Sequence, residues 1–201
     1  MVGEQVIFES TNIKLEGLLS SMPGQRGVVI THPHPLYGGN MDNNVVESLV
    51  RMYQLAGYTT LRFNFRSVGS SEGKYDNGMG EREDVKAALH YLTQRGKKVL
   101  ELAGYSFGSW VNALAISEVD TVDRMVMISP PVAFMDFSSV GLTPQIQLVV
   151  AGSQDQIAPP ELIEKLLPTW NPGAHLEIID GADHFYVGYT EKLESVLTVY
   201  L

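Results

Sequence analysis

The sequence predicts an α/β fold, in which a mostly parallel sheet carries helices on both faces. Two observations favour this fold class. Short β-rich runs alternate with helical patterns along most of the chain, and Gly, Pro, Asn and Ser punctuate the boundaries. Several of the runs are continuously apolar, as in strands that are buried on both faces. No repeat, low-complexity tract or linker interrupts the 201 residues, so we expect a single domain over 1–201.

Eight strands are expected, of which the first two are antiparallel. Residues 5–9 and 13–20 alternate apolar and polar side chains, and Ser10-Thr11-Asn12 separates them, so they predict a hairpin. The remaining strands are expected at 28–32, 59–65, 99–103, 125–129, 145–151 and 176–179. Met125 and Met127 alternate on one strand, and we expect both in the core.

Five helices are expected between and after the parallel strands. In residues 44–55 the apolar side chains recur at helical spacing, and Gly57 ends the pattern. The other helices are expected at 81–95, 106–117, 159–167 and 190–200. No apolar run reaches 18 residues, and the first ten residues carry two Glu and no basic residue, so neither a membrane span nor a signal peptide is expected.

Composition excludes several classes of function. The chain has no Cys, which rules out disulfides, thiol nucleophiles and Cys-ligated metal sites. Its 14 basic and 23 acidic residues give a net charge of −9, which disfavours nucleic acid and anionic membranes as partners. We expect a cytoplasmic protein. An exposed first strand or closing helix often pairs two copies of a chain, so a homo-oligomer is one alternative.

The most specific local motif is Gly104-Tyr105-Ser106-Phe107-Gly108, which follows a predicted strand directly and opens a predicted helix. A G-x-S-x-G motif in this context is typical of a nucleophile elbow. The sharp turn needs small flanking residues, and the helix N-terminus favours the negative charge of a tetrahedral intermediate. The alternative is a helix-capping Ser between two glycines.

A nucleophilic Ser needs a base and an orienting acid. His184 follows the last predicted strand, and Asp155 follows the penultimate one, which gives the chain order Ser, Asp, His. Asp136, after the sixth strand, is the alternative acid. The other candidates are weaker, because Asp120 and Asp123 precede a strand, Asp183 adjoins the histidine and Asp180 lies four residues before it.

These motifs resemble the α/β-hydrolase superfamily over nearly the whole chain, and more narrowly a small lidless branch near the dienelactone-hydrolase-like enzymes. The resemblance rests on residues 32–41 (HPHPLYGGNM), 63–73 (FNFRSVGSSEG), the elbow, and the turns that carry Asp155 and His184. It implies an eight-stranded, mostly parallel sheet without a cap domain, since residues 130–144 are too few for a lid. Relatives have Asp and Gly where this chain has Asn64 and Ser67.

The resemblance also implies an oxyanion hole and a pocket. The amide of Phe107 is one expected donor, and because Pro33 and Pro35 have no N–H, the second is expected from His34 or Leu36. The expected pocket residues are Tyr37, Arg66, Tyr105 and Phe185, with residues 131–137 at the border. Arg66 would either belong to a structural loop or meet a substrate carboxylate.

We therefore expect a serine hydrolase that cleaves a small carboxylic ester or thioester through an acyl-enzyme, with no cofactor. An acyltransferase or peptidase on the same triad, and a non-catalytic binding module of this fold, are the alternatives. His32 and His34 form an alternative pair of metal ligands, and Gly69–Lys74 resembles a phosphate loop. Both are disfavoured, because no further ligand cluster joins the histidines and the loop is one residue short of the motif, with Tyr75 in place of Ser or Thr.

Overall fold

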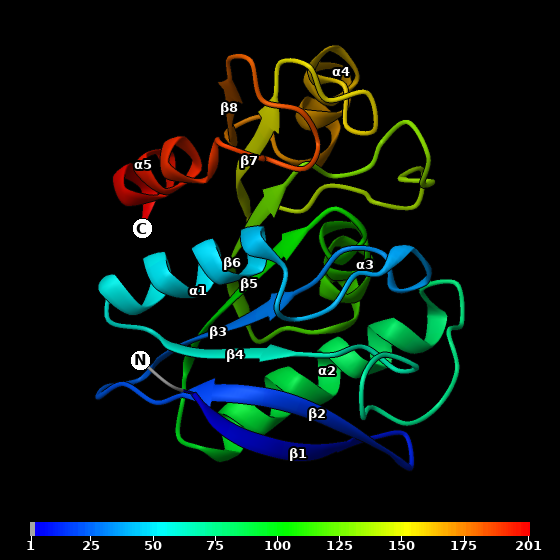
Figure 1. Ribbon diagram of the computed structural model, residues 1–201, viewed down its shortest axis with the longest axis vertical. Helices are drawn as coiled ribbons and strands as arrows, with labels where there is room; N and C mark the ends of the chain where they lie inside the picture. Colours follow the sequence, from blue (N-terminus) through cyan, green and yellow to red (C-terminus); the bar gives the residue numbers. More distant parts are fainter. Residues whose placement is uncertain (1–2) are drawn as a thin grey trace.

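The computed structural model describes residues 3–201 and contains one eight-stranded sheet in the order β1-β2-β4-β3-β5-β6-β7-β8. Figure 1 shows these strands from bottom to top. The strands span Glu4–Ser10 (β1), Ile13–Ser20 (β2), Arg26–Thr31 (β3), Thr59–Phe63 (β4), Val99–Tyr105 (β5), Val122–Ile128 (β6), Ile146–Gly152 (β7) and His175–Ile179 (β8). β1 and β2 pair antiparallel, as do β2 and β4, and all other pairs are parallel.

Helices cover both faces of the sheet. They span Asn44–Leu55 (α1), Met79–Gln94 (α2), Phe107–Ala115 (α3), Pro160–Trp170 (α4) and Thr190–Tyr200 (α5), with short 3-10 turns at Pro35–Tyr37 (η1) and Ile116–Glu118 (η2). The apolar faces of α1 and α5 share one core cluster, and those of α2, α3 and α4 share the other. Over residues 3–201, no helix has both the length and the apolar character needed to cross a bilayer.

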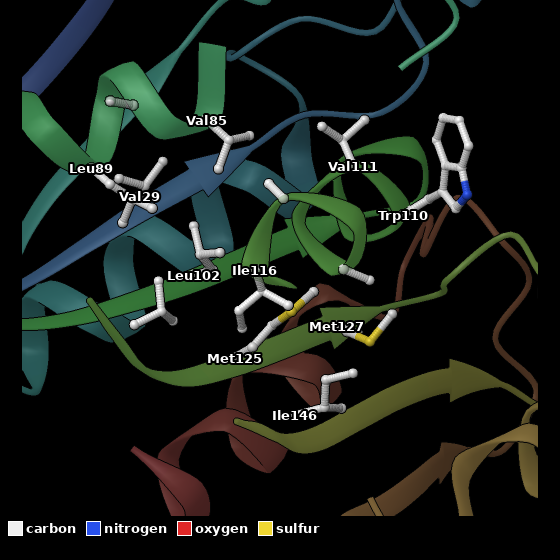
Figure 2. Packing of buried hydrophobic residues seen from close by; sticks show 14 of the residues in the cluster. Val29, Val85, Leu89, Leu102, Trp110, Val111, Ile116, Met125, Met127 and Ile146 are labelled. Atoms are coloured by element: carbon white, nitrogen blue, oxygen red, sulfur yellow. The ribbon is translucent and has the colours of Figure 1, made fainter. Parts of the chain in front are cut away.

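The core on the α2–α3 side is continuous from the sheet into both helices. Figure 2 shows Val85 and Leu89 of α2 and Val111 of α3 above the strand side chains. Met125 and Met127 of β6 are fully buried there, as their alternation predicts. This packing holds the start of α3 against the end of β5, which fixes the turn between them.

The predicted fold class is confirmed, and the differences lie at element boundaries. α2 begins at Met79, two residues earlier than expected, because the Glu81 carboxylate accepts hydrogen bonds from the amides of Asp76 and Gly78. α4 continues past Pro168 to Trp170, whose buried ring packs on Phe137. The connection from β6 to β7 contains no helix or strand, so no cap lies over the carboxyl ends of the strands.

Candidate active site

The turn between β5 and α3 holds Ser106 in a strained backbone conformation, with φ 53° and ψ −120°. The surrounding structure holds this strained conformation in place, since the Ser106 amide donates a hydrogen bond to the carbonyl of Ile128 at 2.8 Å. A Cβ on Gly104 would lie 2.6 Å from the amide nitrogen of Ser109, and one on Gly108 would lie 2.5 Å from Thr31 Oγ1. Both glycines are therefore required by close packing around the serine.

A continuous hydrogen-bonded chain joins three side chains that lie far apart in the sequence. His184 Nε2 lies 2.9 Å from Ser106 Oγ. His184 Nδ1 lies 2.8 Å from Asp155 Oδ2 and 3.0 Å from Oδ1. Ser106 follows β5, Asp155 follows β7 and His184 follows β8, so the parallel strands bring all three to one edge of the sheet.

The environment of Asp155 favours its ionised form. Burial raises the pKa of the Asp155 carboxyl, but the hydrogen bond and charge of His184, the Ala158 amide and Ser129 outweigh burial and leave the pKa below its ordinary value. The amides of Ile157 and Ala158 donate to Oδ1 at 2.9 and 2.8 Å. Asp136, the alternative acid, is exposed, and its carboxylate accepts from the Ser138 amide instead.

Two tyrosines hold the loop that carries His184. Tyr105 Oη donates to the carbonyl of His184 at 2.7 Å. Tyr186 is fully buried with φ 54°, and its Oη lies 2.8 Å from Ser129 Oγ. The sequence analysis missed Ser129 and Tyr186, because the only sequence signals were their positions just after β6 and just after His184.

The loop after β3 forms η1, and His34 caps it. The Leu36 amide donates to His34 Nδ1 at 3.2 Å, and the amides of Tyr37 and Gly39 donate to the His34 carbonyl at 3.1 and 3.0 Å. This contact disfavours Leu36 as oxyanion donor, because its N–H is already engaged within the loop. The geometry leaves the amide of Phe107, at the first turn of α3, and that of His34.

His32 lies beneath this loop and connects two strand ends. Its Nδ1 lies 2.6 Å from the Pro33 carbonyl, and its Nε2 accepts from the Phe65 amide at 3.0 Å. Burial lowers the pKa of His32 to about 4, so the ring is neutral near pH 7. Both ring nitrogens have partners, so the structure does not present His32 and His34 as a pair of metal ligands.

A cavity of about 680 Å³ opens over Ser106. One wall comes from the loop after β3, with Pro33, His34 and Tyr37. The other comes from the later loops, with Pro131, Phe134, Met135, Ile157 and Phe185. Two lining residues were not expected from the sequence. They are Ile157, in the loop after β7, and Asn43, which caps the start of α1.

Three of the four expected pocket residues, Tyr37, Tyr105 and Phe185, line this cavity, and Arg66 does not. The Arg66 guanidinium binds the buried Asp84 carboxylate through two hydrogen bonds of 3.1 and 2.7 Å. Ser10 Oγ donates to the same carboxylate at 2.7 Å. Arg66 therefore belongs to a structural ion pair that ties the loop after β4 to α2, and it is not available to a substrate carboxylate.

The chain is similar to proteins of the same size. No family model matches it. A curated but uncharacterised protein of Rickettsia prowazekii is 34% identical, over 98% of this chain and 88% of that protein. A solved α/β serine hydrolase homologue from Coxiella burnetii is 32% identical with a TM-score of 0.92, over 100% of this chain and 98% of that one.

A third relative bears on the missing cap. The solved structure of a lidless α/β serine hydrolase from Xanthomonas campestris is 30% identical with a TM-score of 0.90, over 99% of this chain and 93% of that one. The uncapped edge of the sheet described above agrees with this likeness. The chain belongs to the α/β serine hydrolases, in their lidless group.

Proposed function

We propose that this protein cleaves a small carboxylic ester or thioester, with Ser106 as nucleophile, His184 as general base and acid, and Asp155 as the orienting acid. The observation that carries the proposal is the hydrogen-bonded chain from Ser106 Oγ through His184 to Asp155. A serine hydroxyl is weak as a nucleophile until an adjacent base accepts its proton. The 2.9 Å contact from Oγ to Nε2 supplies that base.

Two half-reactions complete one turnover. In the first, Ser106 Oγ attacks the substrate carbonyl and His184 Nε2 takes its proton. The tetrahedral intermediate collapses, the bond to the alcohol or thiol breaks, and His184 returns the proton to the leaving group. In the second, water attacks the acyl-enzyme, His184 accepts a proton from it, and the acid leaves as Ser106 recovers the proton.

The negative oxygen of each intermediate needs preorganised donors. The amides of Phe107 and His34 are our candidates, and the N-terminal end of α3 adds a favourable dipole. One such donor typically lowers the barrier by about 3–4 kcal/mol. Asp155 stabilises the imidazolium that forms at each step, and its own pKa below the ordinary value keeps it ionised there.

The test is covalent labelling with a fluorophosphonate, followed by intact mass and peptide mapping. A single adduct on Ser106, absent from Ser106→Ala and His184→Ala, is the expected result. Circular dichroism establishes that each variant is folded. If folded wild-type protein takes no adduct, Ser106 is not activated, and the non-catalytic binding module becomes the better interpretation. Product analysis with added alcohols or amines separates hydrolysis from acyl transfer.

A further inference from the structure

The sheet order determines what surrounds the scissile carbonyl. β5 carries Ser106 at its end, with β3 on one side and β6 on the other. The loops after β3 and β6 therefore stand on opposite sides of the serine. An ester whose carbonyl is attacked by Ser106 Oγ therefore lies between these two walls.

Both walls lack charged side chains and are mostly apolar. Pro33 and Tyr37 lie on the β3 side, together with the polar side chains of His34 and Asn43. Pro131, Phe134 and Met135 lie on the β6 side. In the part of the chain from residue 3 onward, no Lys, Arg, Asp or Glu lines the cavity. Burial lowers the pKa of the lining His34, and the lining His184 already bonds Asp155 through Nδ1 and Ser106 through Nε2.

The basic residues nearest to the site in the sequence either form ion pairs with other residues or lie outside the cavity. Arg66 binds Asp84. Arg62 forms ion pairs with Asp42 and Glu47 and donates to the Met41 carbonyl. Lys74 is exposed on the loop whose next residue, Tyr75, contacts His34, but Lys74 is not a lining residue.

The rim of the cavity is also apolar and open to solvent. Tyr37 is 87% exposed and Phe134 is 73% exposed. Phe185, which also lines the cavity, is 58% exposed. Large aromatic side chains left in water around a cavity mark a surface that apolar groups cover on binding.

We propose that the substrate is uncharged, with apolar groups on both sides of the carbonyl. This proposal rests on the proposed function. The site then rejects acyl groups that end in a carboxylate, and thioesters whose carrier bears phosphates. A charge that leaves water for these walls finds no partner, and its desolvation is uncompensated. The net charge of −9 adds long-range repulsion of anions.

Two matched substrate pairs test this proposal. The first compares p-nitrophenyl 6-methylheptanoate with p-nitrophenyl hemiadipate, in which a carboxylate replaces the terminal isopropyl group. The second compares S-butyryl-N-acetylcysteamine with butyryl-coenzyme A, which carry the same thioester on a neutral and on a phosphorylated carrier. We expect kcat/KM to favour the neutral member of each pair by about 10-fold or more, the scale on which apolar pockets discriminate.

Two lysine substitutions test whether the cavity itself discriminates between neutral and anionic substrates. Phe134→Lys places a cation on the rim, and Leu142→Lys makes the same change of charge at a side chain that is 72% exposed but outside the lining. We expect the preference for neutral substrates to narrow in Phe134→Lys and to persist in Leu142→Lys. Tyr37→Lys repeats the test from the other wall if Phe134→Lys does not fold.

The outcomes separate this proposal from the proposed function. Ser106 labelling with equal or faster turnover of the anionic members overturns the substrate class and leaves the serine hydrolase intact. If that turnover falls in Lys74→Ala, Lys74 is the anion-binding group, and the proposal is equally wrong. An absence of labelling in folded protein refutes the proposed function itself.

Discussion

The imidazole of His34 accepts a hydrogen bond at Nδ1 from the amide of Leu36, at 3.2 Å. Since Nδ1 is an acceptor, the proton of the neutral ring lies on Nε2, which is 3.2 Å from Tyr75 Oη. The ring also packs on Phe107, with the ring centroids 4.7 Å apart. The side chain thus fixes the loop that carries one proposed oxyanion donor against the residue that carries the other.

Removal of this cap should lower catalysis more than stability. We expect His34→Ala to reduce kcat by about 10-fold or more, because the loop amide is no longer preorganised. His34→Asn should recover part of the loss, since an Asn side chain also accepts from an amide two residues on. The measurement is kcat and KM for both variants, with urea unfolding as the control for stability. Equal activity in His34→Ala and wild type would contradict the positioning role.

The two candidate acids differ enough to be separated by one substitution each. Asp155→Asn removes the charge that stabilises the His184 imidazolium and presents an amide to Nδ1, so we expect kcat to fall by about 10⁴-fold. Asp136→Asn is the matched control, because that carboxylate is exposed and accepts only from the Ser138 amide. Its kcat should stay within about 2-fold of wild type. A fully active Asp155→Asn would show that another group orients His184.

The alternation of strands and helices and the position of the elbow were predictable from the sequence, because each rests on a local rule. Alternating β and helical patterns predict a parallel sheet, and a Ser between two glycines at a strand end predicts a sharp turn. The acid at Asp155 and the base at His184 followed from the rule that ligands gather at the carboxyl ends of parallel strands. The structure places both within hydrogen-bonding distance of their partners.

The contacts that support the site could not be predicted in this way. The pairing of Arg66 with Asp84, and of Ser129 with Tyr186, joins residues 18 and 57 positions apart and depends on side-chain packing that no periodicity encodes. The engagement of the Leu36 amide required the conformation of η1. Sequence rules therefore placed residues at strand ends, but they did not determine which of their polar groups remain free.

Asn64 shows how such a contact explains a departure from the family pattern. Its Nδ2 donates to Glu16 Oε1 at 2.7 Å, and its Oδ1 accepts from the Met41 amide at 2.8 Å. An Asp, which relatives have here, has no donor for Glu16 when ionised. The amide therefore suits a position that lies between a carboxylate and a backbone N–H.

Asn64→Asp should consequently destabilise the protein at neutral pH. Two carboxylates would meet at a buried position, and we expect a loss of about 1–3 kcal/mol in the free energy of unfolding. The deficit should shrink as the pH falls, because one carboxyl then becomes protonated and donates to the other. Glu16→Gln in the Asn64→Asp background should restore a donor and recover stability at pH 7. Urea unfolding at pH 5 and pH 7 checks each point, and a pH-independent deficit would argue against charge repulsion.

His32 should make the fold sensitive to mild acid. Its pKa is about 4 in the folded state, chiefly because of burial, and 6.5 in the unfolded chain. Between these values the unfolded state binds more protons, so stability falls as the pH drops from 6.5 toward 4 and full stability is present above 6.5. The gap between the two pKa values corresponds to a loss of about 3 kcal/mol in the free energy of unfolding, which is reached below pH 4.

The matched variant is His32→Gln, which keeps a donor and an acceptor but does not titrate. We expect it to be less stable than wild type at pH 7, because the Gln amide cannot place its donor and its acceptor where the two ring nitrogens of His32 lie. The difference in stability between the two proteins should shrink as the pH falls from 6.5 to 4, since only the wild type loses stability through residue 32. Asp155 and the other carboxyls contribute equally to both proteins and cancel in the comparison. If the difference in free energy of unfolding between the two proteins stays constant across this pH window, His32 is not the group that titrates.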